Sequence, residues 1–437
     1  MGTTGLTVIL FISLFAILLS GIPLGFGLAG VAVIFILWQL GPAGLHLIAI
    51  TAFTDWTNFT LIAIPLFVLM ANFLDSSGIA EDLYEMIYQW IGSIKGGLAM
   101  GTILICTIFA AMAGLSGVAT VTMGLIALPS MLKRHYDKSL ALGSISAGGT
   151  LGILIPPSII MIMYGGLTEE SVGKLFLGGI IPGILITFIF IGYIAIRCLF
   201  QPELGPSVPK EERLSWEAKL RSLNALLMPC ILIIVVLGAI YTGACTPTEA
   251  SGVGAFGAFL CVLIRRRFTW NNFINVLQKT LRFTAMIMWI VMGAKLFSHV
   301  YYAIGAPELV GSVIGGLEVN RWVIVILMQF IVIALGMFLD PLGIMVICTP
   351  IFVPIIIELG FSTLWFGILF TINMEIGYIT PPFGFNLFYM KGVVPKHIKM
   401  VDIYKSVFPF ALLMMLGMGI VMAFPQLALW LPASAAG

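Results

Sequence analysis

The sequence predicts an all-α, multi-pass membrane protein with an inverted-topology repeat, two re-entrant hairpins and two discontinuous helices. Of its 437 residues, 60% are hydrophobic and 9% are charged, so the chain lacks the polar surface of a soluble protein this large. Apolar runs of about 20 residues, enough to cross roughly 30 Å of hydrocarbon, recur along the chain. Two matched Pro-Pro motifs interrupt these runs. Together these observations predict the fold.

The apolar runs define the predicted spans. No Lys or Arg precedes Lys95, so the first run lacks the basic flank of a signal peptide and is predicted to be a retained helix. Two runs have double length and are predicted to be hairpins. The segments are 6–20, 24–40, 56–74, 98–131, 138–165, 175–199, 225–241, 248–264, 283–303, 321–357, 362–390 and 405–424.

These segments predict a first repeat over 1–200, a cytoplasmic linker over 201–222 and a second repeat over 223–437. Two mixed polar and aromatic stretches suit interfacial arms. The first repeat comprises scaffold helices in 1–75, an arm at 79–93, the hairpin 98–131, the broken helix 138–165 and the helix 175–199. The second comprises scaffold helices in 225–303, an arm at 305–318, the hairpin 321–357, the broken helix 362–390 and a final helix 405–424.

Basic residues predict the orientation in the membrane. Four of them lie in the linker 201–222, and Arg265 to Arg267 follow two spans later, so both stretches are predicted to be cytoplasmic. Counting spans from there, the hairpin 98–131 opens to the cytoplasm and the hairpin 321–357 opens to the outside. The topology is therefore ten crossings plus two hairpins. The net charge of +2 is too small to indicate a nucleic-acid surface.

An internal repeat supports this topology. Pro129, Gly152 and the pair Pro156-Pro157 recur 225 residues later, as Pro354, Gly377 and the pair Pro381-Pro382. Met112 and Met337 keep the same spacing, so each hairpin and the helix after it match without a gap. Because the two copies enter from opposite sides, they form an inverted-topology pair, which is a common transporter architecture.

Each Pro-Pro motif is predicted to break its helix. Proline removes a backbone donor and disfavours helix before it, and glycine tolerates an unwound backbone. Freed carbonyls at membrane depth must be buried or line a polar cavity, and carbonyl oxygens suit Na⁺. We expect one ion site where the first hairpin tip meets Gly149 to Pro157, and another where Gly336 to Pro341 meets Gly377 to Phe383. The alternative is a proline kink that only bends each helix.

Isolated polar residues in apolar runs are the candidate substrate ligands. Lys295 lies within a span, so it needs a partner or an aqueous path: it binds a substrate carboxylate, pairs with a carboxylate such as Asp340, or snorkels to an interface. Asp340, at the second hairpin tip, holds an ion, pairs with Lys295 or caps the following helix. Ser116 at the first tip and Asn386 at the end of the second motif complete this set.

Other polar residues have structural interpretations. Thr246 and Glu249 flank a helix start and are predicted to cap it. Glu375, just before the second break, is either an ion-coupling group or one member of a structural pair. The six cysteines show no metal-ligand spacing, and the four histidines show no catalytic spacing. The sequence therefore predicts that the chain is no enzyme and has no bound cofactor.

Four segments resemble the large membrane subunit (DctM-like) of TRAP transporters: HYDKSLALGSISAGGTLGILIPPS, SVGKLFLGGIIPG, GACTPTEASGVGAF and GYITPPFGFN. The resemblance extends over essentially the whole chain. It implies a scaffold-and-elevator architecture like that of the ion-transporter superfamily, with Na⁺ as the coupling ion. It also implies three kinds of partner: a small four-helix membrane subunit, a periplasmic substrate-binding protein and a small organic acid. The implied location is the bacterial inner membrane.

The resemblance also implies which residues hold Na⁺, mostly through backbone carbonyls. In the first site these are Gly114, Ser116, Gly149, Gly152, Ile155 and Pro156. In the second they are Gly336, Gly377, Thr380 and Phe383. C4-dicarboxylates, sialic acid and other sugar or keto acids all remain possible cargoes. Two alternatives stay open: a stand-alone ion-coupled carboxylate transporter, and a membrane-embedded enzyme, for which no catalytic cluster is found.

Overall fold

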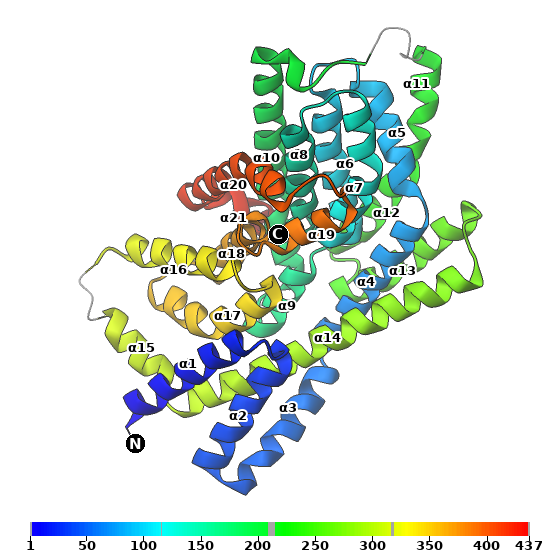
Figure 1. Cartoon of the computed structure of the whole chain (residues 1–437). Coiled ribbons are helices and arrows are strands. Elements are labelled where there is room, and N and C mark those ends of the chain that lie inside the picture. Colours follow the sequence, from blue (N-terminus) through cyan, green and yellow to red (C-terminus); the bar gives the residue numbers. More distant parts are fainter. Residues whose placement is uncertain (1, 115, 209–214, 316–318, 436–437) are drawn as a thin grey trace.

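The computed structural model describes residues 2–114, 116–208, 215–315 and 319–435, and within them every regular element is helical. Leu115 of the first hairpin tip, residues 209–214 of the linker and residues 316–318 of the second arm lie outside the described residues. The helices form an elongated assembly crossed by one long diagonal helix, α14 (Trp270–Ala303) (Figure 1).

The described residues of the first half of the chain form ten α-helices. They are α1 (Thr3–Ser20), α2 (Leu24–Leu40), α3 (His46–Trp56), α4 (Ala63–Ser76), α5 (Ile79–Ile91), α6 (Gly97–Ala113), α7 (Ser116–Lys133), α8 (Lys138–Thr150), α9 (Ile159–Thr168) and α10 (Val172–Phe200). Four 3₁₀ turns accompany them: η1 (Pro42–Leu45), η2 (Phe59–Ile62), η3 (Leu151–Ile153) and η4 (Pro202–Leu204).

The second half continues with α11 to α21. Besides α14 these are α11 (Trp216–Ser222), α12 (Asn224–Tyr241), α13 (Pro247–Ile264), α15 (Ala306–Gly315), α16 (Arg321–Gly336), α17 (Pro341–Glu358), α18 (Thr363–Ile379), α19 (Phe385–Val393), α20 (Met400–Ala423) and α21 (Gln426–Ser434). Thr246 and Glu249 form the predicted cap of α13 as a reciprocal capping box.

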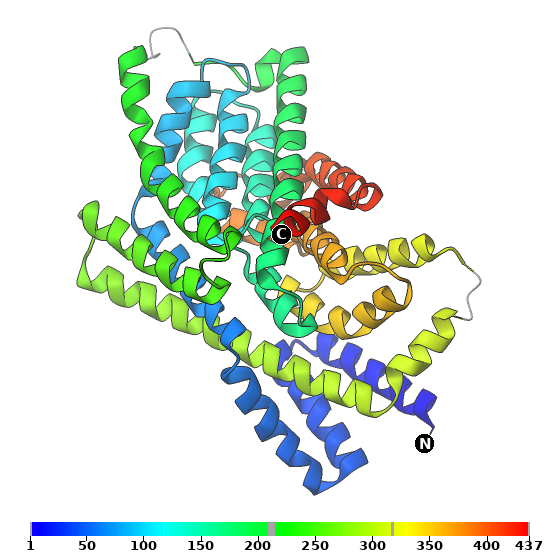
Figure 2. The same cartoon turned by 180° about the vertical axis from the view of Figure 1, so that it is seen from behind.

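The helices pack as two groups. The frame helices are α1–α4 and α12–α14, in which α2 packs along α14 and α4 packs along α13. The inner bundle contains α6–α10 and α16–α21, with α8 against α6, α7 and α20, and α18 against α16 and α20. Figures 1 and 2 show α2 and α3 on one side of α14 and the inner bundle on the other. Each group takes helices from both halves of the chain.

Two helices of the inner bundle are buried on every side. All residues of α8 from Leu140 to Thr150 are buried, as are those of α18 from Leu364 to Gly377. A helix that is apolar on all sides is typical of such a central position. Small residues on it allow the backbones of neighbouring helices to come close together. In α8, a Cβ on Gly143 would lie 2.4 Å from the backbone oxygen of Ser406. The two helices that carry the Pro-Pro motifs are therefore central to the inner bundle.

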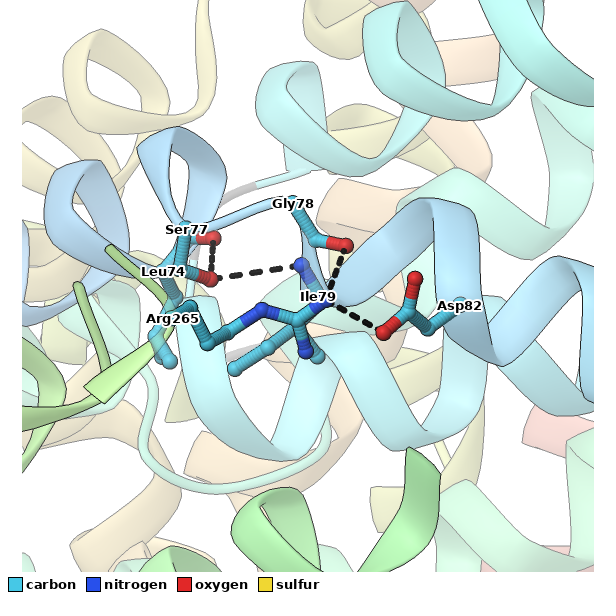
Figure 3. A network of polar contacts seen from close by, with 6 residues as sticks. All are labelled: Leu74, Ser77, Gly78, Ile79, Asp82 and Arg265. Atoms are coloured by element: carbon cyan, nitrogen blue, oxygen red, sulfur yellow. Dashed lines mark hydrogen bonds and ion pairs between the residues drawn. The ribbon is translucent and has the colours of Figure 1, made fainter. Parts of the chain in front are cut away.

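Short helices connect the frame to the inner bundle. The predicted arms are α5, which links α4 to α6, and α15, which links α14 to α16. At the start of α5, the Arg265 guanidinium donates to the Gly78 carbonyl at 3.2 Å and pairs with the Asp82 carboxylate (Figure 3). Gly78 has a φ of +73°, which favours glycine at this turn. The arm is thus attached at its first turn to the end of α13.

The predicted span boundaries need three corrections. An additional helix, α3, precedes η2 and α4, which together form the span predicted over 56–74. The helix expected at 283–303 begins 13 residues earlier, since Thr269 caps α14 through the Asn272 amide at 3.2 Å. An additional helix, α21, follows the final predicted span.

Eight helical segments among the described residues are long and apolar enough to cross a membrane, and six shorter apolar helices accompany them. The eight include α7 and α17, the second helices of the two hairpins. This pattern confirms a multi-pass membrane protein.

Candidate functional site

Both Pro-Pro motifs interrupt their helices as predicted. The first break separates η3 from α9, which starts after Ser158, whose hydroxyl accepts from the Met161 amide at 3.3 Å. The second separates α18 from α19. The Pro156-Pro157 and Pro381-Pro382 peptide bonds are both cis. Where α8 and α18 end, some of the last carbonyls accept from the chain that follows: Gly148 from the Leu151 amide and Gly377 from the Thr380 amide.

The first hairpin tip contacts the first break. Gly114 ends α6 with a φ of +63°, and a Cβ there would lie 2.5 Å from the Pro157 carbonyl oxygen. Within α7, the Thr120 hydroxyl is buried without a hydrogen-bond partner among the described residues, and a Cβ on Gly149 would collide with it. The structure thus brings Gly114 and Gly149 to the first break as predicted, with Thr120 as a polar neighbour that sequence reasoning missed.

The second hairpin tip contacts the second break in a similar way. The Phe383 amide donates to the Met337 carbonyl at 3.1 Å, and the Cα of Gly336 lies 2.8 Å from where a Cβ on Gly377 would be. Thr380 directs its hydroxyl to the Ile376 carbonyl at 2.6 Å. The predicted residues of the second site therefore lie together. The side chain of Phe383 is exposed, so only its backbone belongs to this contact.

A polar bridge connects the first tip to both broken helices. The Ser116 hydroxyl donates to the Asn386 side-chain oxygen at 3.3 Å, and the Asn386 amide nitrogen donates to the Ser146 carbonyl at 2.6 Å. Ser116, Asn386 and Ser146 are all buried. Two of the four predicted substrate residues thus contact each other where α7, α8 and α19 meet.

A cavity of about 530 Å³ lies between the frame and the inner bundle. Asp340 is the one charged residue in its described lining, and the Asp340 carboxylate also caps α17 by accepting from the Gly343 amide at 3.4 Å. A cavity of about 350 Å³ that contains Lys279 and Asp75 adjoins it through shared lining residues. Both cavities are lined by Ser116, Phe283, Tyr378 and Tyr389, and the larger one also by Phe26, Trp289, Ile290 and Phe385.

Five helix N-termini converge on the larger cavity. Its lining includes the first residues of α2 (Leu24), α7 (Ser116), α9 (Ile159) and α19 (Phe385), and the capping residue of α17 (Asp340). Helix N-termini carry free amide N–H groups and the positive end of the helix dipole, so they attract anions. Ser158 already caps α9 and the Asp340 carboxylate caps α17, so the N-termini of α2, α7 and α19 are the backbone groups that favour an anion in this cavity.

Lys295 lies apart from the other predicted substrate residues. Its ammonium pairs with the Asp55 carboxylate at 2.6 Å, and Asp55 is 1% exposed. The pairing with Asp340 considered from the sequence is wrong, because a carboxylate on α3 occupies this position instead. Lys295 also lines a separate cavity of about 330 Å³, with Glu169, His299 and Thr349. The structure brings Ser116, Asp340 and Asn386 together but not Lys295.

The donor groups at both breaks fit a hard cation. They are backbone carbonyls and the hydroxyls of Ser116, Thr120 and Thr380, and oxygen-only sets of this kind suit Na⁺. In the described parts of the chain, no three His, Cys, Asp or Glu side chains gather in a way that could hold a transition metal. The oxygen donors present at the breaks therefore fit Na⁺.

The sequence pattern of one protein family covers nearly the whole chain. Residues 11–427 match the DctM component of the tripartite ATP-independent periplasmic transporters. The chain belongs to the DctM family. This membership confirms that it is a transporter subunit and not an enzyme, and that it is a multi-pass membrane protein.

Individual DctM relatives span the same length with different named cargoes. The chain is 34% identical to the C4-dicarboxylate TRAP large permease DctM of Pseudomonas aeruginosa, covering 93% of each chain. It is 30% identical to the ectoine TRAP large permease TeaC of Halomonas elongata, covering 98% of this chain and 99% of the relative. It is 28% identical to the sialic acid TRAP large permease SiaM of Vibrio cholerae, covering 95% and 96%.

Solved structures support the fold. The YdaH transporter of Alcanivorax borkumensis superimposes with a TM-score of 0.63 at 16% identity, covering 89% of this chain and 90% of that one. The MtrF efflux pump of Neisseria gonorrhoeae gives 0.62 at 13% identity, covering 90% and 85%. At these identities the likeness concerns the fold alone. The DctM chain thus shares its helical arrangement with other membrane transporters.

Proposed function

We propose that this chain is the large transmembrane subunit of a sodium-coupled, binding-protein-dependent TRAP transporter that imports a small organic acid into the cell across the bacterial inner membrane. The convergence of five helix N-termini on one cavity carries this proposal. The described lining contains no Lys or Arg, so the backbone groups supply the attraction for a carboxylate. We assign the neutral side chains of Ser116 and Asn386 to the carboxylate of the cargo, and the Asp340 carboxylate to hydrogen-bond donors elsewhere on the cargo.

The two breaks are the proposed Na⁺ sites. Gly114, Ser116, Gly149, Gly152, Ile155 and Pro156 form the first, and Gly336, Gly377, Thr380 and Phe383 form the second. Their fit rests on the oxygen donors described above and on the contact of each hairpin tip with its break. Na⁺ held beside the cavity adds positive charge next to the carboxylate, so ion and cargo favour each other's binding. The downhill entry of Na⁺ then drives uptake.

An elevator movement suits this arrangement. The cavity lies between frame residues Leu24 and Trp289 on one side and inner-bundle residues Ser116 and Asp340 on the other. The arms α5 and α15 each connect a frame helix to the first helix of a hairpin. We propose that the two hairpins are re-entrant, and that the inner bundle carries the cargo across while the frame stays fixed in the membrane.

The partners in this proposal are a small four-helix membrane subunit and a periplasmic substrate-binding protein. The family description names a tripartite transporter, which supports three components. Many apolar side chains of the frame are exposed in the isolated chain, such as Leu227, Ile234 and Phe256. They provide a surface for lipid and for the small subunit.

Uptake into proteoliposomes tests the proposal. With the small subunit and the cognate binding protein present, cargo uptake should require an inward Na⁺ gradient. Equal uptake after replacement of Na⁺ by K⁺ would contradict sodium coupling. Uptake that persists without the binding protein would instead support the alternative, a stand-alone ion-coupled transporter of carboxylates.

A further inference from the structure

Glu375 is a carboxylate buried in the centre of the inner bundle. It lies in α18, its side chain is 0% exposed, and neither oxygen has a side-chain hydrogen-bond partner among the residues that the structure describes. The other buried carboxylate with unbonded oxygens, Asp55, has Lys295 as its ion partner. No described Lys, Arg or His pairs with Glu375. Buried polar groups without partners are rare, so this one requires a physical account.

The direction of the side chain connects the two breaks. Asn373 and Gly377 face α16, where Asn373 donates to the Gln329 side chain at 2.7 Å and Gly377 contacts Gly336. Residue 375 lies on the opposite side of the helix from these positions, because successive residues rotate by about 100°. On that side α18 packs against η3, and the backbone amide of Leu154, next to Ile155 at the first break, lies beside the Glu375 carboxyl. A carboxylate from the second broken helix is thus directed at the first ion site.

The matched repeats explain why the first site needs this group. Asp340 places a carboxylate at the second hairpin tip, but the matching residue of the first tip, 225 positions earlier, is Leu115. In the first copy, Thr150 matches Glu375, and its hydroxyl is satisfied by the Ala147 carbonyl at 2.8 Å. Carbonyls supply only partial charges, so the first site has no formal negative charge of its own.

We propose that the Glu375 carboxylate is the charge partner of the cation held at the first break. This inference rests on the proposed sodium coupling. An isolated buried charge is strongly unfavourable, whereas a cation nearby offsets that cost. The same attraction raises the affinity of the first site for Na⁺, and it also links α18 to the first break when the ion is bound.

Thermal unfolding of the purified complex with its small subunit tests this proposal. The unfolding temperature is followed by intrinsic tryptophan fluorescence while NaCl replaces choline chloride at constant ionic strength. Glu375→Gln keeps the size of the side chain and removes its charge, so the Na⁺ concentration at half-maximal stabilisation should rise by about tenfold or more. Without Na⁺ the variant should be at least as stable as the unaltered protein, since an uncompensated buried carboxylate has been removed.

A matched control and a second variant complete the test. Glu358→Gln makes the same substitution at the exposed end of α17 and should leave the Na⁺ response unchanged. Glu375→Asp keeps the charge and should give a midpoint between those of the unaltered protein and the Gln variant. A Gln variant with an unchanged midpoint, or equal midpoints for Asp and Gln, would overturn the proposal. Absence of any Na⁺ response in the unaltered protein would instead overturn sodium coupling itself.

Discussion

Gly336 at the second hairpin tip and Gly377 in the second broken helix pack backbone against backbone. A Cβ on Gly336 would lie 2.9 Å from the Gly377 Cα, and a Cβ on Gly377 would lie 2.8 Å from the Gly336 Cα. A Cβ atom is not accommodated at such distances. It would collide with backbone atoms of the other helix, which cannot rotate away as a side chain can. The contact therefore requires glycine on both helices.

Gly377→Ala should separate the second tip from the second break. The added methyl group must push α16 from α18, which moves the carbonyls of the proposed second Na⁺ site by several tenths of an ångström or more. We expect Na⁺-dependent uptake to fall by about tenfold or more, since ion coordination depends on such distances. Gly419→Ala is the control, because nothing lies within 4 Å of that position in α20. Normal uptake by the Gly377 variant would contradict the proposed site.

Lys295→Ala should mainly reduce stability. It leaves the Asp55 carboxylate buried without its ion partner, and breaking a buried pair costs about 3 kcal/mol or more. The unfolding temperature should therefore drop, and Asp55→Asn in the same chain should restore most of it. The control variant Lys405→Ala, at an exposed position of α20, should change neither the unfolding temperature nor the uptake of cargo. Uptake by the double variant decides the remaining role of Lys295: normal uptake would exclude it from cargo binding.

Asn386→Ala should weaken cargo binding through loss of the bridge at the first tip. The Ser116 hydroxyl and the Ser146 carbonyl both lose their buried partner, at about 1–3 kcal/mol for each unsatisfied group. We expect a higher KM for uptake, with Ser116→Ala giving a smaller effect because it removes one bond of the two. The exposed Asn271 provides the control variant Asn271→Ala. Equal KM values for the Asn386 and Asn271 variants would exclude the bridge from cargo binding.

Arg265→Gln should loosen the start of the arm α5. It removes the ion pair with Asp82 and weakens the bond to the Gly78 carbonyl, each worth about 1 kcal/mol or less at a partly exposed position. Amide hydrogen exchange at Ser77 to Asp82 should become faster, while exchange in α8 stays the same. Arg266→Gln changes the adjacent exposed residue and should not accelerate exchange. Equal exchange in both variants would show that Arg265 does not hold the arm.

The local features of the fold could be predicted from the sequence because they depend on neighbouring residues. The breaks at Pro156 and Pro381 follow from missing donors, and the cap at Thr246 follows from its spacing to Glu249. The 225-residue spacing identified the hairpins that contact the breaks. The Pro-Pro and capping signals lie in short stretches of chain, and the repeat is found by comparing the chain with itself, so none of them requires knowledge of packing.

Contacts between distant helices could not be predicted in the same way. Asp55 lies just before an apolar run, so no local pattern indicated that α3 would bring it to Lys295. Thr120 resembles any other polar residue of a helix until Gly149 is placed against it. The convergence of Leu24 with the N-termini of the inner bundle depends on how the frame packs. Such features arise from tertiary arrangement alone.

The proposed use of helix ends to attract the cargo has an evolutionary consequence. Amide groups of the main chain persist through every substitution that preserves the helices, so a preference for a carboxylate that rests on them would be inherited with the fold. Side chains such as Trp289, Phe385 and Tyr389 are free to change the size and shape of the cavity. Related permeases can therefore change their cargo while keeping the helix N-termini that bind the acid group.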